Sequence, residues 1–185
     1  MTLRRVLTPI LASTVLAACS ETNLLPSPIF QNAVDSSTMY ALSSTELGTP
    51  SGFDLFRGQP VRPELGEPFD FVVDFADGRA QLQPGQVIGV QQEAGYLVVN
   101  EPFDAIPEAP VDEYISDSAL VLTPALVFVM RSRINRLNCS VFLQLPHYGK
   151  FRVLSVDTAA RSVTFEHLVN LNCGYRDLEV GLPVN

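Results

Sequence analysis

The chain has 185 residues, of which 12 are basic and 20 acidic, so its formal net charge is −8. This length suits one domain with a sizeable hydrophobic core. Lys150 is the only lysine, and no basic patch is available to follow a phosphate backbone, so the composition argues against nucleic acid as a partner.

The chain begins with the pattern of a secretory signal. Arg4 and Arg5 precede an apolar stretch from Val6 to Leu16, and small residues precede Cys19. A transmembrane helix needs about 20 apolar residues, and this stretch is shorter and is interrupted by polar residues and Pro9. The sequence therefore predicts an exported protein rather than one with a helical span here.

Residues 16–19, "LAAC", resemble the lipobox of bacterial lipoproteins. The resemblance implies that residues 1–18 are removed, that the Cys19 thiol receives a diacylglycerol, and that the new amine is acylated. Two or more acyl chains hold a protein stably on a bilayer. Ser20, rather than Asp, follows the cysteine, which in this family favours the outer membrane. The alternative is a signal peptide with an incidental cysteine.

The mature chain is expected to have a tether and one domain. Residues 19–38 are rich in Ser, Asn, Gln and Pro and are interpreted as the lipidated cysteine and a flexible tether, although Ile29 and Phe30 are candidates to dock on the domain. Residues 39–185 form the predicted domain. Without Arg4 and Arg5 the mature chain has a charge near −10, so membrane contact is expected through the acyl chains alone.

Strand signals dominate the first half of the domain. In Phe69–Phe75, "FDFVVDF", the apolar residues alternate with Asp70 and Asp74, which predicts a half-buried strand. Asp77-Gly78 predicts a hairpin turn, with a return strand over 79–83. Further strands are expected over 86–91 and 96–99.

Residues 101–118 interrupt this pattern with three prolines and six acidic residues. They are interpreted as a solvated loop; a calcium site is the alternative, because Ca²⁺ prefers carboxylate oxygens. Strand signals resume at 119–122, at 125–131 with an almost continuous apolar run, at 139–145, at 148–157 and at 161–169. Short strands with frequent turns predict an all-β fold, an antiparallel meander or sandwich-like sheet.

The final hairpin can be given a register. If residues 158–160 form the loop, Asp157 faces Arg161, Val153 faces Phe165, and Phe151 faces His167. One face then carries four apolar side chains and the other is mostly polar, whereas a slip of one residue would mix the two kinds. The apolar side chains are those of Phe151, Val153, Val163 and Phe165.

The remaining cysteines and the two histidines are the candidate site residues. Cys139 and Cys173, in an exported chain, predict one disulfide that closes a loop of about 35 residues; neither has metal-ligand spacing. His147 and His167 are predicted core or loop residues on the apolar side of the final hairpin. The alternative is a pair of haem ligands about 13 Å apart along the backbone.

Two further resemblances bear on function. Phe69–Phe75 and the hairpin over 148–166 resemble HmuY-like lipoproteins, which implies an all-β, surface-anchored domain and, for the characterised members, haem held by paired axial ligands. The segments Asn172–Leu178 and Gly181–Pro183 resemble a tail that recurs in uncharacterised bacterial lipoproteins. This chain has no tryptophan, and neither histidine aligns with a family ligand.

The sequence contains none of the common catalytic motifs, so we expect a non-enzymatic binding or envelope-interaction module anchored through Cys19. The alternatives are an HmuY-like haem-binding protein that uses His147 and His167, and a hydrolase without a recognisable motif. No cofactor other than haem, and no metal, is predicted. The bilayer and an unidentified envelope partner or small ligand are the expected partners.

Overall fold

A computed structural model describes residues 25–43, 46, 48–134 and 145–183. Within these residues the regular structure consists of β-strands and three short 3-10 helices, which confirms the predicted all-β antiparallel fold. The strands are β1 (Val34–Tyr40), β2 (Gly52–Asp54), β3 (Gln59–Val61), β4 (Phe71–Ala76), β5 (Arg79–Pro84), β6 (Gly95–Val98), β7 (Leu120–Val121), β8 (Val127–Arg131), β9 (Tyr148–Asp157) and β10 (Ser162–Asn170). The 3-10 helices are η1 (Pro63–Leu65), η2 (Gly85–Ile88) and η3 (Phe103–Ala105).

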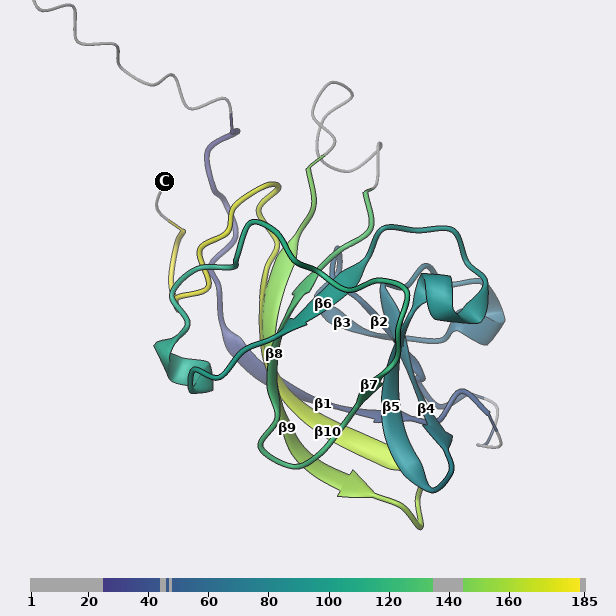
Figure 1. Ribbon diagram of the computed structural model, residues 1–185. Coiled ribbons are helices and arrows are strands. Elements are labelled where there is room, and N and C mark those ends of the chain that lie inside the picture. The colour runs from purple at the N-terminus through teal and green to yellow at the C-terminus, as the bar shows by residue number, and fades with distance from the viewer. Residues whose placement is uncertain (1–24, 44–45, 47, 135–144, 184–185) are drawn as a thin grey trace, which may run out of the picture.

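The strands form two five-stranded antiparallel sheets that curve around a shared interior (Figure 1). The first has the order β1-β10-β9-β8-β6, and the second has the order β3-β2-β4-β5-β7. After β1 the chain passes directly to the second sheet, where the backbone N–H of Leu42 donates to the carbonyl of Val73 at 2.8 Å. The two sheets are therefore joined along this edge.

The shared interior is filled by aromatic rings. Phe53 and Phe71 of the second sheet pack edge-on against Phe151 of the first, with ring centroids 5.2 and 5.6 Å apart. Phe151 also stacks on Phe128 at 5.3 Å. These side chains are fully buried, so the space between the sheets is a packed core. The larger buried members of this core are Met39, Phe53, Leu55, Phe71, Phe75, Leu82, Phe128, Met130, Phe151 and Phe165.

The first sheet also buries its outer face. A second apolar cluster joins Val127 and Val129 of β8 to Leu168 of β10, and residues 103–109 and the C-terminal tail cover it. Phe103, Ile106 and Ala109 of this cover are buried. Most other residues of the 101–118 segment are exposed, so it is solvated along much of its length, as expected, but is anchored to the sheet by these three side chains. The continuous apolar run of β8 is explained, because this strand is covered on both faces as predicted.

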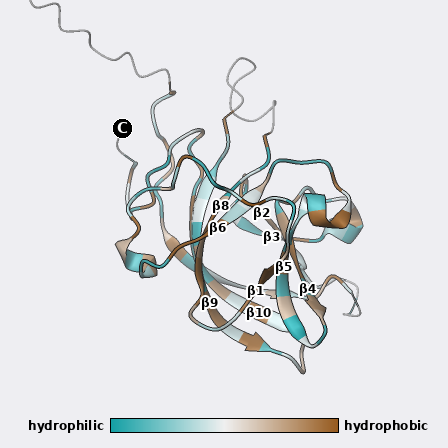
Figure 2. Cartoon of the chain, in the orientation of Figure 1, coloured by the Kyte–Doolittle hydropathy of each residue, from teal (hydrophilic) through white to brown (hydrophobic). Residues whose placement is uncertain are grey.

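Several sequence-based predictions are confirmed in detail. Figure 2 shows hydrophilic and hydrophobic residues along β5, whose buried residues alternate with less buried ones, whereas β4 is apolar except at Asp74. Their hairpin closes with Ala76 opposite Arg79, and the two turn residues Asp77 and Gly78 have φ values of 51° and 72°. Positive φ at both positions is the requirement of the two-residue turn that matches strand twist.

The predicted register of the β9–β10 hairpin is confirmed near its middle and is wrong near its turn. Val153 faces Phe165 and Phe151 faces His167, as predicted. A bulge between Thr164 and Phe165 shifts the pairing, so Asp157 faces Ser162 rather than Arg161. The cause is the turn: the Asp157 carboxylate accepts the N–H groups of Ala159 and Ala160 at 2.9 Å, and Arg161 takes a φ of 49°.

Two other predictions are wrong. The segment 86–91 is not a strand; most of it lies in η2 and the turn after it, closed by Gly89 at φ 82° and by the Val90 N–H on the Gly85 carbonyl at 2.8 Å. Asp70 does not lie on a polar face; it precedes β4 and is fully buried. The predicted strand over 139–145 lies almost entirely outside the described residues.

The ordered domain starts before residue 39, the predicted boundary, because β1 begins at Val34 and the chain is bound to the domain from Pro26 onward. We call residues 25–33 the N-terminal segment and residues 171–183 the C-terminal tail. They lie on the same side of the molecule (Figure 1). In the part of the chain that is described, no helix has the length and apolar character to cross a membrane.

Candidate functional site

Both predicted histidines are buried inside the domain. His167, in β10, packs edge-on against Phe53 at 5.0 Å between ring centroids, and its Nε2 lies 2.9 Å from the Ser37 hydroxyl. His147, just before β9, packs edge-on against Phe56 at 4.4 Å and interacts with the backbone of Leu171. Burial lowers the pKa of His167, and it lowers that of His147 from 6.5 to about 4. Both rings are therefore neutral near pH 7.

These surroundings do not fit a pair of haem ligands. His167 packs against Phe53 and Phe151 and His147 packs against Phe56, and each histidine already has a polar partner. Leu171, beside His147, is four residues beyond His167, which corresponds to about 13 Å along a strand. To bind one iron, both rings would have to leave the core and converge. We interpret them as core residues that complete the aromatic packing.

The cysteine predictions fall partly outside the described residues. Cys19 and Cys139 are not among them, so lipidation and the Cys139–Cys173 disulfide remain predictions. Cys173 lies in the turn that follows β10. The neighbouring Gly174 donates its N–H to the Pro146 carbonyl at 3.1 Å, so this turn lies beside Pro146.

A buried charge cluster was not expected from the sequence. Arg133 contacts Asp54 at 2.9 Å and Asp70 at 3.0 Å through its two terminal nitrogens, and both carboxylates are buried. Asp70 also accepts the backbone N–H groups of Leu55 and Arg133, each at 2.7 Å. The cluster joins the loop after β2, the start of β4 and the chain after β8.

The charged groups of this cluster all have partners within the protein. Burial raises the pKa of Asp70 from 3.8 to about 6, against the opposing effects of the Arg133 guanidinium and the two N–H donors. The guanidinium also lies over the Phe56 ring, 4.9 Å from its centroid. Every charged group here is engaged by protein, so the arrangement pins three loops together.

The C-terminal tail holds the N-terminal segment in place. The Asn172 side chain accepts the N–H groups of Ile29 and Phe30 at 2.8 and 3.0 Å and donates to the Phe30 carbonyl at 2.8 Å. The Tyr175 hydroxyl donates to the Pro26 carbonyl at 2.9 Å. Asn32 and Gly181 exchange backbone hydrogen bonds of 2.7 and 3.0 Å. We call this contact between the two termini the terminal junction.

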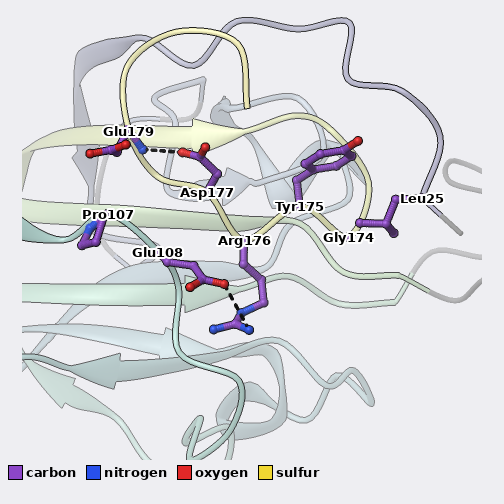
Figure 3. A pocket seen from close by; sticks show the side chains of 8 residues that line it. All are labelled: Leu25, Pro107, Glu108, Gly174, Tyr175, Arg176, Asp177 and Glu179. Carbon is purple, nitrogen blue, oxygen red and sulfur yellow. Dashed lines mark hydrogen bonds and ion pairs between the residues drawn. The ribbon is translucent and has the colours of Figure 1, made fainter. Parts of the chain in front are cut away.

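The candidate functional site is a cavity of about 390 Å³ at the terminal junction (Figure 3). It lies between the N-terminal segment, the tail and the 101–118 segment. Its lining combines an apolar side chain from the N-terminal segment with ionisable side chains from the other two. The lining residues are Leu25, Pro107, Glu108, Gly174, Tyr175, Arg176, Asp177 and Glu179.

One ion pair joins two of the charged side chains that line this cavity. Arg176 contacts Glu108 at 3.2 Å and donates from Nε to the Ala109 carbonyl at 2.7 Å. The Asp177 carboxylate accepts the Glu179 N–H at 2.8 Å. With Arg176 engaged by Glu108, the acidic groups outnumber the basic one. The cavity therefore favours polar ligands that bring hydrogen-bond donors or a positive charge.

Sequence reasoning missed the role of these residues because none belongs to a catalytic motif. The one signal was the tail resemblance, which covers Asn172–Leu178 and Gly181–Pro183 and so includes most of the tail residues of the terminal junction. Glu108 and Asp177, 69 positions apart, form an isolated antiparallel bridge. That proximity depends on the whole sheet between them.

Among residues 25–43, 46, 48–134 and 145–183, no group of three or more His, Cys, Asp or Glu side chains is placed to hold a metal ion. Comparison of the chain with models of known protein families gave no match, and comparison with curated protein sequences also gave none.

Proposed function

We propose that this protein is an extracytoplasmic lipoprotein anchored in the outer membrane through acylated Cys19. Its β domain is a non-enzymatic module that binds an envelope partner at the terminal junction. The observation that carries this is the short distance along the chain between the lipobox and the junction. Pro26, held by Tyr175, is only seven residues after Cys19.

We also propose that the domain is a sandwich-like antiparallel structure that is cross-linked by a Cys139–Cys173 disulfide. The contact between Gly174 and Pro146 supports this pairing, because only six residues separate Cys139 from Pro146. Mass spectrometry of proteolytic fragments should find the two cysteines in one linked fragment that separates on reduction. Two free thiols would contradict the pairing.

Anchoring can be tested on the full chain expressed in a bacterium with two membranes. We expect an intact mass that corresponds to a chain beginning at Cys19 with three acyl chains, and co-flotation with outer-membrane vesicles. The Cys19→Ser variant should lose both properties. A mature wild-type chain without lipid would overturn the anchoring proposal.

Binding at the terminal junction can be tested by site-specific photo-crosslinking in intact cells. A photoreactive residue at Glu108, whose side chain is exposed beside Arg176, should give a discrete adduct with an envelope component. The same residue at Leu154, exposed near the far end of β9, is the matched control. Identical adduct patterns at the two positions, or none at Glu108, would contradict a binding role for the junction.

Haem binding and hydrolysis are not part of this proposal. The buried surroundings of His147 and His167 disfavour the first, and no arrangement of the described residues specifically favours the second. A haem titration of the protein should show no saturable Soret change that depends on either histidine.

A further inference from the structure

Four large apolar side chains are exposed at the terminal junction. Ile29 and Phe30 of the N-terminal segment are 75% and 48% exposed, and Val180 and Leu182 of the tail are 71% and 52% exposed. Exposed apolar residues scattered singly need no explanation, but a contiguous group indicates an interaction surface.

Backbone hydrogen bonds join the two segments that carry these four residues. Val180 and Leu182 flank Gly181, which pairs with Asn32 in an antiparallel bridge, and Phe30 is two residues before Asn32. The Asn172 side chain fixes the backbone of Ile29 and Phe30 with three hydrogen bonds. We call these residues the junction patch. Because its backbone is held before any partner arrives, little conformational entropy is lost on docking.

The position of the predicted anchor indicates that the bilayer is the surface that covers the junction patch. Pro26 is seven positions after Cys19, and a fully extended chain of that length spans at most about 25 Å. Ile29 follows Pro26 by three residues. A bilayer that holds the acyl chains is therefore always within reach of the junction patch, and tethering gives it a high effective concentration there.

The chemistry of the patch suits the interface of a zwitterionic membrane. It contains no Lys or Arg, and Glu179, beside Val180, is exposed. Attraction to anionic lipid is thus not available, and the contact would depend on apolar burial among the headgroups. A protein partner of opposite charge would need a basic surface. Glu179, beside the patch, is the feature that would favour such a partner.

We propose that Ile29, Phe30, Val180 and Leu182 form a membrane-docking surface that inserts into the bilayer that carries Cys19 and thereby sets the orientation of the domain. This inference rests on the proposed lipid anchor and adds an apolar contact to it. The cavity beside Arg176 would then lie close to the membrane, where it faces partners in or near the bilayer.

The experiment uses the full lipidated chain in phosphatidylcholine–phosphatidylethanolamine vesicles with brominated acyl chains, which quench nearby indole fluorescence. The natural chain has no tryptophan, so the Phe30→Trp variant contains a single reporter. Leu65→Trp, at a 62% exposed position in η1 of the second sheet, is the control. We expect Phe30→Trp to lose about half of its emission or more, and Leu65→Trp to be unaffected.

A second variant separates the patch from the tether. Adding Val180→Ser to Phe30→Trp keeps the anchor and should reduce the quenching. If the lipidated protein floats with vesicles but Phe30→Trp is not quenched, the docking surface is overturned while the anchor stands. A blue-shifted but unquenched emission would mean that protein, such as a second copy of this chain, covers the patch, and would also overturn it. If Cys19 has no lipid, the proposed function fails and this inference fails with it.

Discussion

The two faces of the sheet β1-β10-β9-β8-β6 are both buried, but against different kinds of structure. The inner face packs on the second sheet through aromatic rings, with Phe151 in contact with Phe53, Phe71 and Phe128. The outer face is covered by η3, by the segment after it and by the tail. Regular strands thus bury the inner face, whereas irregular chain buries the outer one.

The polar groups on the two faces differ accordingly. The inner side carries two buried imidazoles, whose pKa values are lowered by burial. The outer face carries Lys150, which is buried, donates to the Ile106 carbonyl at 3.0 Å and lies over the Phe103 ring at 4.8 Å. The irregular cover thus supplies a backbone carbonyl to a buried ammonium group, because a carbonyl outside a strand ladder is available as an acceptor.

The largest effect is expected on the inner face. Phe151→Ala removes a ring that packs against four phenylalanines and His167, and should lower the free energy of unfolding by about 3–5 kcal/mol. Urea denaturation followed by circular dichroism measures this. Leu154→Ala, at a 46% exposed position on the same strand, should change stability by less than about 0.5 kcal/mol. Equal losses would mean that the inner face is not the dominant core.

The pH dependence of stability should reveal the neutral imidazole at His147. Because its pKa is about 4 in the folded protein and 6.5 when unperturbed, its contribution is complete above pH 6.5 and is lost as the pH falls toward 4. This shift corresponds to up to about 3 kcal/mol. Stability curves of the wild type and of His147→Gln should therefore converge or cross on acidification.

The wild type and His147→Gln must be compared because protonation of Asp70 changes the stability of the folded protein in the opposite direction. Burial raises its pKa to about 6, so folding is favoured as Asp70 takes up a proton below that pH. Subtracting the His147→Gln curve from the wild-type curve removes this common contribution. Parallel curves between pH 7 and pH 4 would contradict a buried neutral His147.

A smaller loss is expected on the outer face. Leu168 is fully buried there, and Leu168→Ala should lower the free energy of unfolding by about 2–3 kcal/mol. The loss should be below that of Phe151→Ala, because a smaller side chain is removed and the irregular cover can settle into the space. Val98→Ala, at a partly exposed position in the same sheet, is the control. A loss larger than that of Phe151→Ala would reverse the ranking of the two faces.

The smallest effect concerns the charge on the outer face. Lys150→Met keeps the length of the side chain but leaves the Ile106 carbonyl without its donor, and should cost about 1 kcal/mol. Removal of the buried charge offsets part of the lost hydrogen bond. Thermal unfolding compared with that of Lys150→Arg measures it. A decrease of several kcal/mol in the free energy of unfolding would show that the ammonium group, rather than apolar contact, holds the irregular chain on the outer face of the sheet.

Much of the strand structure was predictable because alternation along one strand is local. The pattern of 69–75 predicted β4, Asp77-Gly78 predicted its turn, and the apolar run of 125–131 predicted a strand covered on both faces. The failures were also local. Asp157 closes a four-residue turn with its own carboxylate, and the segment 86–91, predicted as a strand, lies mostly in a 3-10 helix and the turn after it.

The candidate site was not predictable in the same way. The histidines were the visible candidates, and both are buried, in agreement with their prediction as core or loop residues on the apolar side of the hairpin. Arg133 meets Asp54 and Asp70 only because two sheets bring distant segments to one place. No motif marks the pairing of Glu108 with Arg176, since it requires the whole first sheet to be assembled.

The amino-acid sequence alone was enough to predict an exported, acidic, all-β chain with a lipobox, because these properties depend on composition and on patterns within a few residues. Only the tertiary structure showed that the N-terminal segment is bound to the tail, that the 101–118 segment covers a sheet face, and that a cavity lies between them. The physical reason is that buried polar groups and apolar faces must find partners, and which partners they find depends on contacts between residues far apart in the chain.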